Sequence, residues 1–210
     1  MSIIRVRSIL FLLMFALAGA AYGRGATPKE LVVNLKFKPQ EGAHSTTANI
    51  PPSMLDKSVA IHVTEHRNES DPKVIGQGTG GDDKTFPIKS ATEIKPFIDE
   101  TLESVAKSFG LKVSEKGGDR SLNITVTRFF IDESNKALGS VYSSEVKLAY
   151  TLKSSGGKTL AEGATTGSAH RYGHAHSEEN INEVLSDALK EAFANVLNDS
   201  KLQDAWAGKK

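Results

Sequence analysis

The last third of the sequence contains an apolar stripe that fixes one element of the fold. Within residues 181–197, apolar side chains recur at spacings of three and four, which places them on one side of an α-helix. Ser177 precedes the stripe as an N-cap, and Glu178 and Glu179 occupy the first turn, where the helix dipole favours acids. The pattern predicts a long helix that ends near Asn198 and packs on a broad apolar surface. The stripe consists of Ile181, Val184, Leu185, Ala188, Leu189, Ala192, Phe193, Val196 and Leu197.

A second apolar stripe lies in the middle of the chain and also has helical spacing. Its members are Ile94, Ile98, Leu102, Val105 and Phe109. Gly110 follows where a C-terminal cap belongs. Capping signals conflict at the other end, so this helix is expected to begin within residues 90–96.

The remaining apolar segments alternate with polar residues, as half-buried β-strands do. Turn residues at 116–119 indicate a hairpin between the third and fourth of these strands, and residues 154–157 reverse the chain before the last. Residues 132–138 are expected to be a connection. Residues 67–89 are expected to be a long loop, because they contain two prolines and four glycines. The predicted strands are residues 31–37, 59–66, 111–113, 122–127, 142–152 and 159–168.

Strands that follow one another, with one helix in the middle and one at the end, indicate an α+β fold. We expect two layers, in which a mainly antiparallel sheet is covered on one face by the two helices. The predicted organisation is a signal peptide at residues 1–23, an N-terminal strand and loop at 24–58, an α+β domain at 59–198 and a tail at 199–210.

The first residues have the composition of a secretory signal peptide. Arg5 and Arg7 precede an apolar run at residues 9–17, and small residues follow at 18–23. The apolar run is shorter than the roughly 20 residues of a membrane-spanning helix. We therefore expect export, with cleavage between Ala18 and Arg24.

The charge of the expected mature chain argues against nucleic-acid binding. Removing residues 1–23 takes two of 26 basic residues and leaves 24 against 25 acidic ones, a net charge of −1. Phosphate affinity needs a concentrated excess of Lys and Arg. A near-neutral domain does not supply that excess.

Cysteine is absent from the sequence. Its absence removes disulfides, thiolate nucleophiles and thiolate metal sites from consideration. It also removes the residue that carries lipid after a bacterial signal peptide. We therefore expect an unlipidated mature protein that is stabilised by burial of apolar side chains.

Half of the six histidines lie within seven residues, in the segment that enters the last helix. Imidazole is a common ligand of zinc, copper and nickel, so His170, His174 and His176 are candidate metal ligands. A closed site needs about four ligands with supporting contacts. The alternative, in which the three side chains lie in solvent on a loop, stays open. No other cofactor is predicted.

Two short motifs resemble catalytic signatures but lack their context. Residues 62–66 spell H-x-x-E-H, as in inverted zinc peptidases, yet the β-branched residues there predict a strand, on which Glu65 points away from the two histidines. Ser104 and Lys107 spell S-x-x-K, but no S-D-N or K-T-G motif follows. We predict no catalytic residues and no enzymatic activity.

Several dispersed segments are similar to a known family. They are KVIG at residues 73–76, FGLKV at 109–113, LNITVTRF at 122–129, the long strand that opens at Gly139, and SDAL at 186–189. On these residues the chain resembles the YajG-like family of bacterial envelope lipoproteins over about residues 59–198. The resemblance implies a two-layer α/β envelope protein without known catalytic residues, similar in layout to auxiliary lipoproteins of outer-membrane lipid transport and assembly. The chain departs from the family in lacking the lipid-bearing cysteine.

Together these features predict a non-enzymatic exported envelope protein, a binding or auxiliary module in envelope assembly or transport. Its partner is expected to be an envelope protein or a lipid, bound at the free sheet face or the long loops, with no nucleic acid and no transmembrane helix in the mature chain. We expect a periplasmic or secreted location. Association with the outer membrane from the periplasm is compatible with it. The alternative is a periplasmic metal-binding protein that uses His170, His174 and His176.

Overall fold

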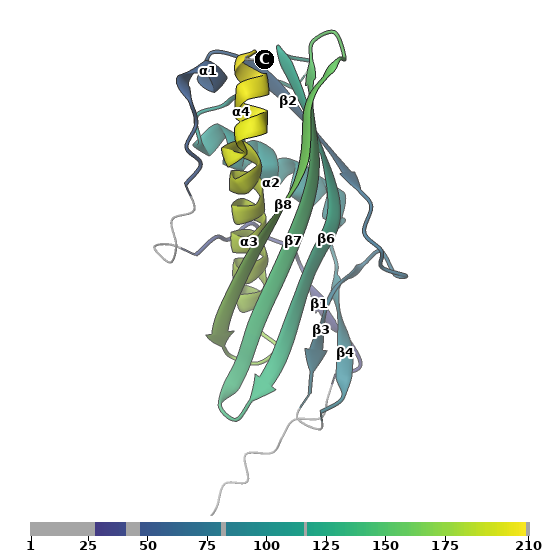
Figure 1. Cartoon of the computed structure of the whole chain (residues 1–210). Coiled ribbons are helices and arrows are strands. Elements are labelled where there is room, and N and C mark those ends of the chain that lie inside the picture. The colour runs from purple at the N-terminus through teal and green to yellow at the C-terminus, as the bar shows by residue number, and fades with distance from the viewer. Residues whose placement is uncertain (1–27, 41–46, 81–82, 116, 209–210) are drawn as a thin grey trace, which may run out of the picture.

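The computed structural model describes residues 28–40, 47–80, 83–115 and 117–208 (Figure 1). The predicted signal peptide at residues 1–23 lies outside this part of the chain. The strands are β1 (Leu31–Val33), β2 (Ser58–Glu65), β3 (Val74–Thr79), β4 (Thr85–Ser90), β5 (Lys112–Val113), β6 (Arg120–Lys136), β7 (Gly139–Ser154) and β8 (Thr159–Gly173). The helices are α1 (Pro52–Leu55), α2 (Ile94–Ser108), α3 (Glu178–Asn198) and α4 (Ser200–Ala207).

The strands form one mixed sheet in which antiparallel pairing predominates. The long strands β6, β7 and β8 pair antiparallel along almost their whole length. On its other side β6 pairs in parallel, first with β2 and then with β3. Helix α3 packs along β8 and β7, whereas α2 packs on β2 and β5. The α+β class and the mainly antiparallel sheet are therefore confirmed.

Both long helices have the ends that the sequence predicts. Helix α3 begins after Ser177, whose side-chain oxygen accepts a hydrogen bond from the Asn180 N–H at 3.2 Å, and it ends at Asn198. Helix α2 ends beside Gly110, which has a φ of +86° that favours glycine. In the residues that the structure describes, no helix is both long enough and apolar enough to cross a membrane.

The expectation of a long loop at residues 67–89 is wrong, because β3 and β4 form an antiparallel pair there. The glycines of β3 serve close packing. A Cβ atom on Gly76 would lie 2.1 Å from the Ile131 carbonyl oxygen, and one on Gly78 would lie 2.2 Å from the Phe86 ring. Glycine in this segment therefore marks close approach of neighbours in the sheet.

The expected hairpin between residues 111–113 and 122–127 is also wrong. Strand β5 pairs in parallel with the beginning of β2, where Ser58 lies opposite Lys112. The connection from β2 to β5 contains β3, β4 and then α2. Helix α2 returns the chain to the beginning of β2, so β5 pairs with β2 in parallel. Strand β2 thus lies between β5 and β6.

The two ends of the domain differ most from their predicted form. Strand β1 stops at Val33, and the following residues bind α3 instead, with the Lys36 N–H donating to the Asn182 side chain at 2.9 Å. The segment 199–210, expected to be a tail, contains α4. Its Leu202 and Trp206 are fully buried, so α4 contributes to the core.

Candidate functional site

The three candidate metal ligands lie in different surroundings. Strand β8 continues to Gly173, so His170 lies in an exposed position of a strand and the prediction of a loop for it is wrong. His174 is exposed just beyond the strand. His176 has a left-handed backbone, with φ of 56°, and its ring meets the edge of Phe86 at a centroid distance of 5.2 Å.

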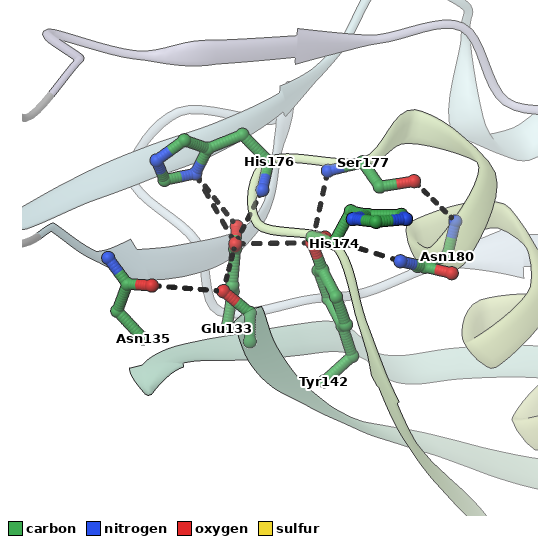
Figure 2. A network of polar contacts seen from close by, with 8 residues as sticks. Glu133, Asn135, Tyr142, His174, His176, Ser177 and Asn180 are labelled. Atoms are coloured by element: carbon green, nitrogen blue, oxygen red, sulfur yellow. Dashed lines mark hydrogen bonds and ion pairs between the residues drawn. The ribbon is translucent and has the colours of Figure 1, made fainter. Parts of the chain in front are cut away.

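No group of three or more His, Asp or Glu side chains in the described residues is arranged to hold a metal ion. Of the three histidines, His176 makes side-chain contacts that give it another role (Figure 2). Metal binding by His170, His174 and His176 stays a prediction.

A buried carboxylate is the centre of the polar cluster shown in Figure 2. Glu133 on β6 is 1% exposed. Its Oε1 atom accepts hydrogen bonds from the Ser140 hydroxyl at 2.8 Å and from the His176 N–H at 2.7 Å. The His176 Nδ1 atom lies 3.3 Å from the carboxylate. A buried carboxylate is tolerated only when such donors surround it.

Tyr142 on β7 links this carboxylate to the start of α3. Its hydroxyl lies 3.2 Å from Glu133 Oε1 and also reaches the His174 carbonyl oxygen, and either oxygen can accept its proton. The same hydroxyl accepts a hydrogen bond from the Ser177 N–H at 3.0 Å. The Asn180 side chain donates to the His174 carbonyl at 3.3 Å. The cluster therefore fastens the β8–α3 connection to β6 and β7.

Burial of the phenol raises the pKa of Tyr142 to about 12, an effect that the Ser177 N–H opposes and the nearby Glu133 carboxylate strengthens. The phenol is thus a firm hydrogen-bond donor at neutral pH and is not poised to exchange a proton. Carboxylate, imidazole and phenol meet here, but the carboxylate and the phenol are buried and only the His176 ring is partly exposed. The arrangement holds the chain together better than it serves acid–base chemistry.

The raised pKa of Tyr142 predicts a loss of stability in alkali. A tyrosine whose pKa rises from 10.0 to about 12 on folding stabilises the protein fully below pH 10 and progressively less as the pH rises toward 12. Each pH unit between these two values is worth about 1.4 kcal/mol, so on the order of 1 kcal/mol of unfolding free energy should be lost by pH 11. Urea unfolding from about pH 9 to pH 11 should show a smaller loss in Tyr142→Phe than in the natural chain. Equal losses in the two proteins would contradict this role.

Sequence reasoning did not identify Glu133, and the reason is a bulge. The inward positions of β6 are even-numbered up to Val126, and a register shift between Val126 and Arg128 makes Phe129, Ile131 and Glu133 the inward residues that follow. Alternation continued from residue 122 would have pointed Glu133 outward. The only signal in the sequence was that Phe129 and Ile131 are apolar at odd positions.

The two catalytic-like motifs occupy the positions that the sequence predicts. His62 is exposed on strand β2, and Glu65 at its end pairs with the buried Arg67 at 2.7 Å. Arg67 also donates to the carbonyl of Val74 at 2.5 Å, so the Glu65–Arg67 pair holds the β2–β3 connection in place. A cavity of about 550 Å³ lies between this connection and the first turn of α2. Ser104 is exposed on α2, and Lys107 of the same motif pairs with Glu103 at 3.4 Å.

Substitution of His176 is expected to affect stability differently from substitution of the other two histidines. Replacing exposed His170 and His174 by Ser should change the unfolding free energy by less than about 0.5 kcal/mol. His176→Ala should cost about 1–3 kcal/mol, because it removes a partner of buried Glu133. Calorimetric titration with zinc should give no tight stoichiometric binding. Tight binding that disappears when His170 and His174 are replaced by Ser would establish the metal site.

An exposed apolar patch lies at the turn between β6 and β7. We define the hairpin-tip patch as Leu138, Val141 and Tyr172. Leu138 is 90% exposed and Tyr172 is 56% exposed, and Val141 lies opposite Tyr172 on the neighbouring strand. The tip is compact, since a Cβ atom on Gly139 would lie 3.0 Å from the Tyr172 hydroxyl. Two of the three exposed large hydrophobic side chains in the described residues thus lie at this end of the sheet.

The outward surface of β6 and β7 continues from the patch as a mixed polar and aromatic surface. The Arg128 guanidinium stacks 4.6 Å from the centre of the Phe130 ring. Arg128 also pairs with Glu145 on β7, and Lys147 pairs with the same carboxylate at 3.3 Å. These side chains are partly exposed, so this surface can form charged and aromatic contacts with another molecule.

The comparisons with known proteins identify one family and a set of distant structures. Residues 45–206 match a family described as uncharacterized lipoprotein, and this match covers most of the chain. The search of curated proteins gave no match.

Three solved structures illustrate the likeness in structure. Protein XCC0632 from Xanthomonas campestris is 11% identical, with a TM-score of 0.43 over 85% of this chain and 96% of that chain. A PelC dodecamer from Paraburkholderia phytofirmans is 11% identical, with a TM-score of 0.39 over 75% and 93%. A minor lipoprotein from Acinetobacter baumannii is 8% identical, with a TM-score of 0.31 over 72% and 92%. All three TM-scores lie below 0.5, so these likenesses support no functional conclusion.

Proposed function

This chain belongs to the family of uncharacterized lipoproteins, and from that premise we propose that it is a non-enzymatic protein of the bacterial cell envelope that binds a protein partner through the hairpin-tip patch. The observation that carries this proposal is the exposure of Leu138 and Tyr172 at the same end of the sheet, at and beside the β6–β7 turn. Isolated exposed apolar residues are common, but adjoining ones with a polar surround are typical of interaction sites.

The packing of the helices on one face of the sheet would leave the opposite face uncovered. Along β7, side chains from Ser140 to Leu152 alternate strictly between buried and more exposed positions. The buried set contacts the core that α3 completes, and α2 and α3 contact each other. We infer that both helices cover one face of the sheet. The opposite face of β6, β7 and β8 is then open to a partner.

Chemistry at the tip favours a protein over a lipid. The patch combines a leucine, a valine and a tyrosine, and tyrosine is enriched where proteins meet because it offers a large apolar ring with a polar end. The adjoining Arg128, Glu145 and Lys147 bring charges of both signs. Such mixed charges suit the polar rim of a protein interface, whereas an anionic lipid surface favours a concentrated positive charge.

The expected location follows from the same proposal. An exported protein of this family meets its partner in the periplasm or at the outer membrane. The YajG-like relationship, with its auxiliary role in lipid transport or envelope assembly, is the narrower form of the proposal. It is supported by the sequence segments KVIG at residues 73–76 and LNITVTRF at 122–129.

Charge placed in the patch should abolish partner binding without unfolding the protein. The natural chain and the double variant Leu138→Glu, Tyr172→Glu would be used to capture proteins from solubilised envelopes, with quantitative mass spectrometry as the readout. Ser104→Glu is the matched control, because Ser104 is exposed on α2. We expect the double variant to lose the proteins that the natural chain and the control both capture. Equal capture by all three would contradict the proposal.

A further inference from the structure

Strand β8 is an edge of the sheet. It pairs with β7 on one side and with no other strand in the described part of the chain. Figure 1 shows it as the outermost of the three long strands, with its last residues beside the β6–β7 turn. An edge strand presents unpaired N–H and C=O groups, and these can hydrogen-bond to an added strand.

Two contacts with α3 show which backbone groups of β8 face this edge. The Ser168 N–H donates to Glu191 Oε2 at 2.7 Å, and the Thr166 carbonyl accepts from the Asn195 side chain at 2.9 Å. In an antiparallel strand the N–H and C=O of one residue point to the same side and alternate along the chain. The backbone groups of His170 and Tyr172 therefore face the edge as well.

Helix α3 covers the middle of the edge but leaves its last part open. A Cβ atom on Gly167 would lie 2.1 Å from the Ala188 carbonyl oxygen, so the helix backbone rests directly on β8 at that level. Beyond it, His170 and Tyr172 have exposed side chains, and no described residue caps their outward backbone groups as Glu191 and Asn195 do for the middle. The open part ends at Gly173, over which the Asn180 side chain lies.

We propose that the partner contributes an extended segment that adds to β8 as a further strand, hydrogen-bonded to the backbone of His170 and Tyr172. This inference rests on the proposed function, because it uses the same end of the molecule. The added segment would place a large apolar side chain against Leu138 and Tyr172, which supply the side-chain selectivity that backbone pairing lacks.

A second copy of this chain is a poorer occupant than an extended segment of another protein. Pairing β8 with β8 of another copy would set the two strands about 4.8 Å apart. In each copy Glu191 and Asn195 of α3 already bind the outward backbone groups of Ser168 and Thr166, so two copies could pair only over the two open residues of each strand. An extended segment without a helix on it meets no such obstacle.

The test uses proline, which removes a single N–H and is tolerated at an edge when that N–H points outward. A displayed library of random linear peptides would be selected on the natural chain, and the most enriched peptide titrated against His170→Pro and Ala164→Pro. Ala164 is the matched control, because its backbone faces the same edge on the far side of the part covered by α3. We expect binding about five- to tenfold weaker in His170→Pro and unchanged in Ala164→Pro.

Hydrogen exchange of the natural chain gives a second readout that does not depend on the folding of a variant. The amides of His170 and Tyr172 should exchange quickly in the free protein and slowly in the peptide complex. Failure to enrich any peptide, unaltered exchange at both amides, or equal binding by the two proline variants would overturn strand addition. If Leu138→Glu, Tyr172→Glu still abolished envelope capture in that case, the proposed function would stand without it.

Discussion

Replacing Phe193 by alanine is expected to lower the free energy of unfolding by about 3–5 kcal/mol. Phe193 is fully buried in α3, and its neighbours Leu189 and Leu197 on the same stripe are also fully buried. Removing the ring deletes its transfer free energy and leaves a cavity that the surrounding sheet cannot close completely. Denaturant unfolding monitored by circular dichroism measures the difference.

Lys190 provides the control for this helix. It is only partly buried, so Lys190→Ala should change the unfolding free energy by about 0.5 kcal/mol or less. Leu189→Ala should cost about 2–5 kcal/mol, well above the control. A Phe193→Ala protein as stable as Lys190→Ala would show that α3 does not complete the core.

Replacing Glu133 by leucine is expected to cost about 3 kcal/mol or more. Leucine has a similar volume but no acceptor, so the Ser140 hydroxyl and the His176 N–H lose the oxygen that they share. Each buried donor left without a partner costs about 1–3 kcal/mol. Glu133→Gln retains an acceptor oxygen and should cost distinctly less.

The same substitution should act locally at the start of α3. The amide of His176 donates to Glu133, and the Ser177 N–H donates to the adjoining Tyr142. Hydrogen exchange at both amides should become faster in Glu133→Leu and stay slow in Glu133→Gln. If the leucine variant were as stable as the natural chain, the desolvation free energy of the buried carboxylate would equal the stabilisation from its hydrogen bonds. That result would contradict the prediction.

The sequence predicted those elements whose pattern is local. Helix α3 was readable from its spacing and from the Ser177 cap, because a helix buries one stripe whatever it packs on. Strand β7 was readable because one of its faces is buried along its whole length. The pairing of β5 with β2 was not readable, since it depends on where α2 returns the chain.

Elements defined by distant contacts were missed. The glycines of β3 read as loop residues, although Gly76 is required by the approach of Ile131 more than fifty residues later in the chain. Helix α4 read as a tail, because it has only two fully buried side chains, Leu202 and Trp206. Neither contact leaves a periodic signal in its own segment.

The candidate site was foreseen less well than the fold. The histidine cluster drew notice to His176, and that residue does contact a carboxylate, but its partner Glu133 was hidden by the bulge in β6. The hairpin-tip patch joins Leu138 to Tyr172 through the pairing of β7 with β8. Residues that are thirty-four positions apart in the sequence (172 minus 138) share a surface only once the sheet has formed.

Site-specific photo-crosslinking in living cells tests the binding of a partner at the hairpin tip most directly. A photoreactive amino acid would replace Leu138 in one strain and Ser104 in another, since both positions are exposed and only the first lies in the patch. We expect one discrete crosslinked envelope protein from position 138 and none from position 104. Illumination that yields no adduct from position 138, or the same adducts from both positions, would contradict it.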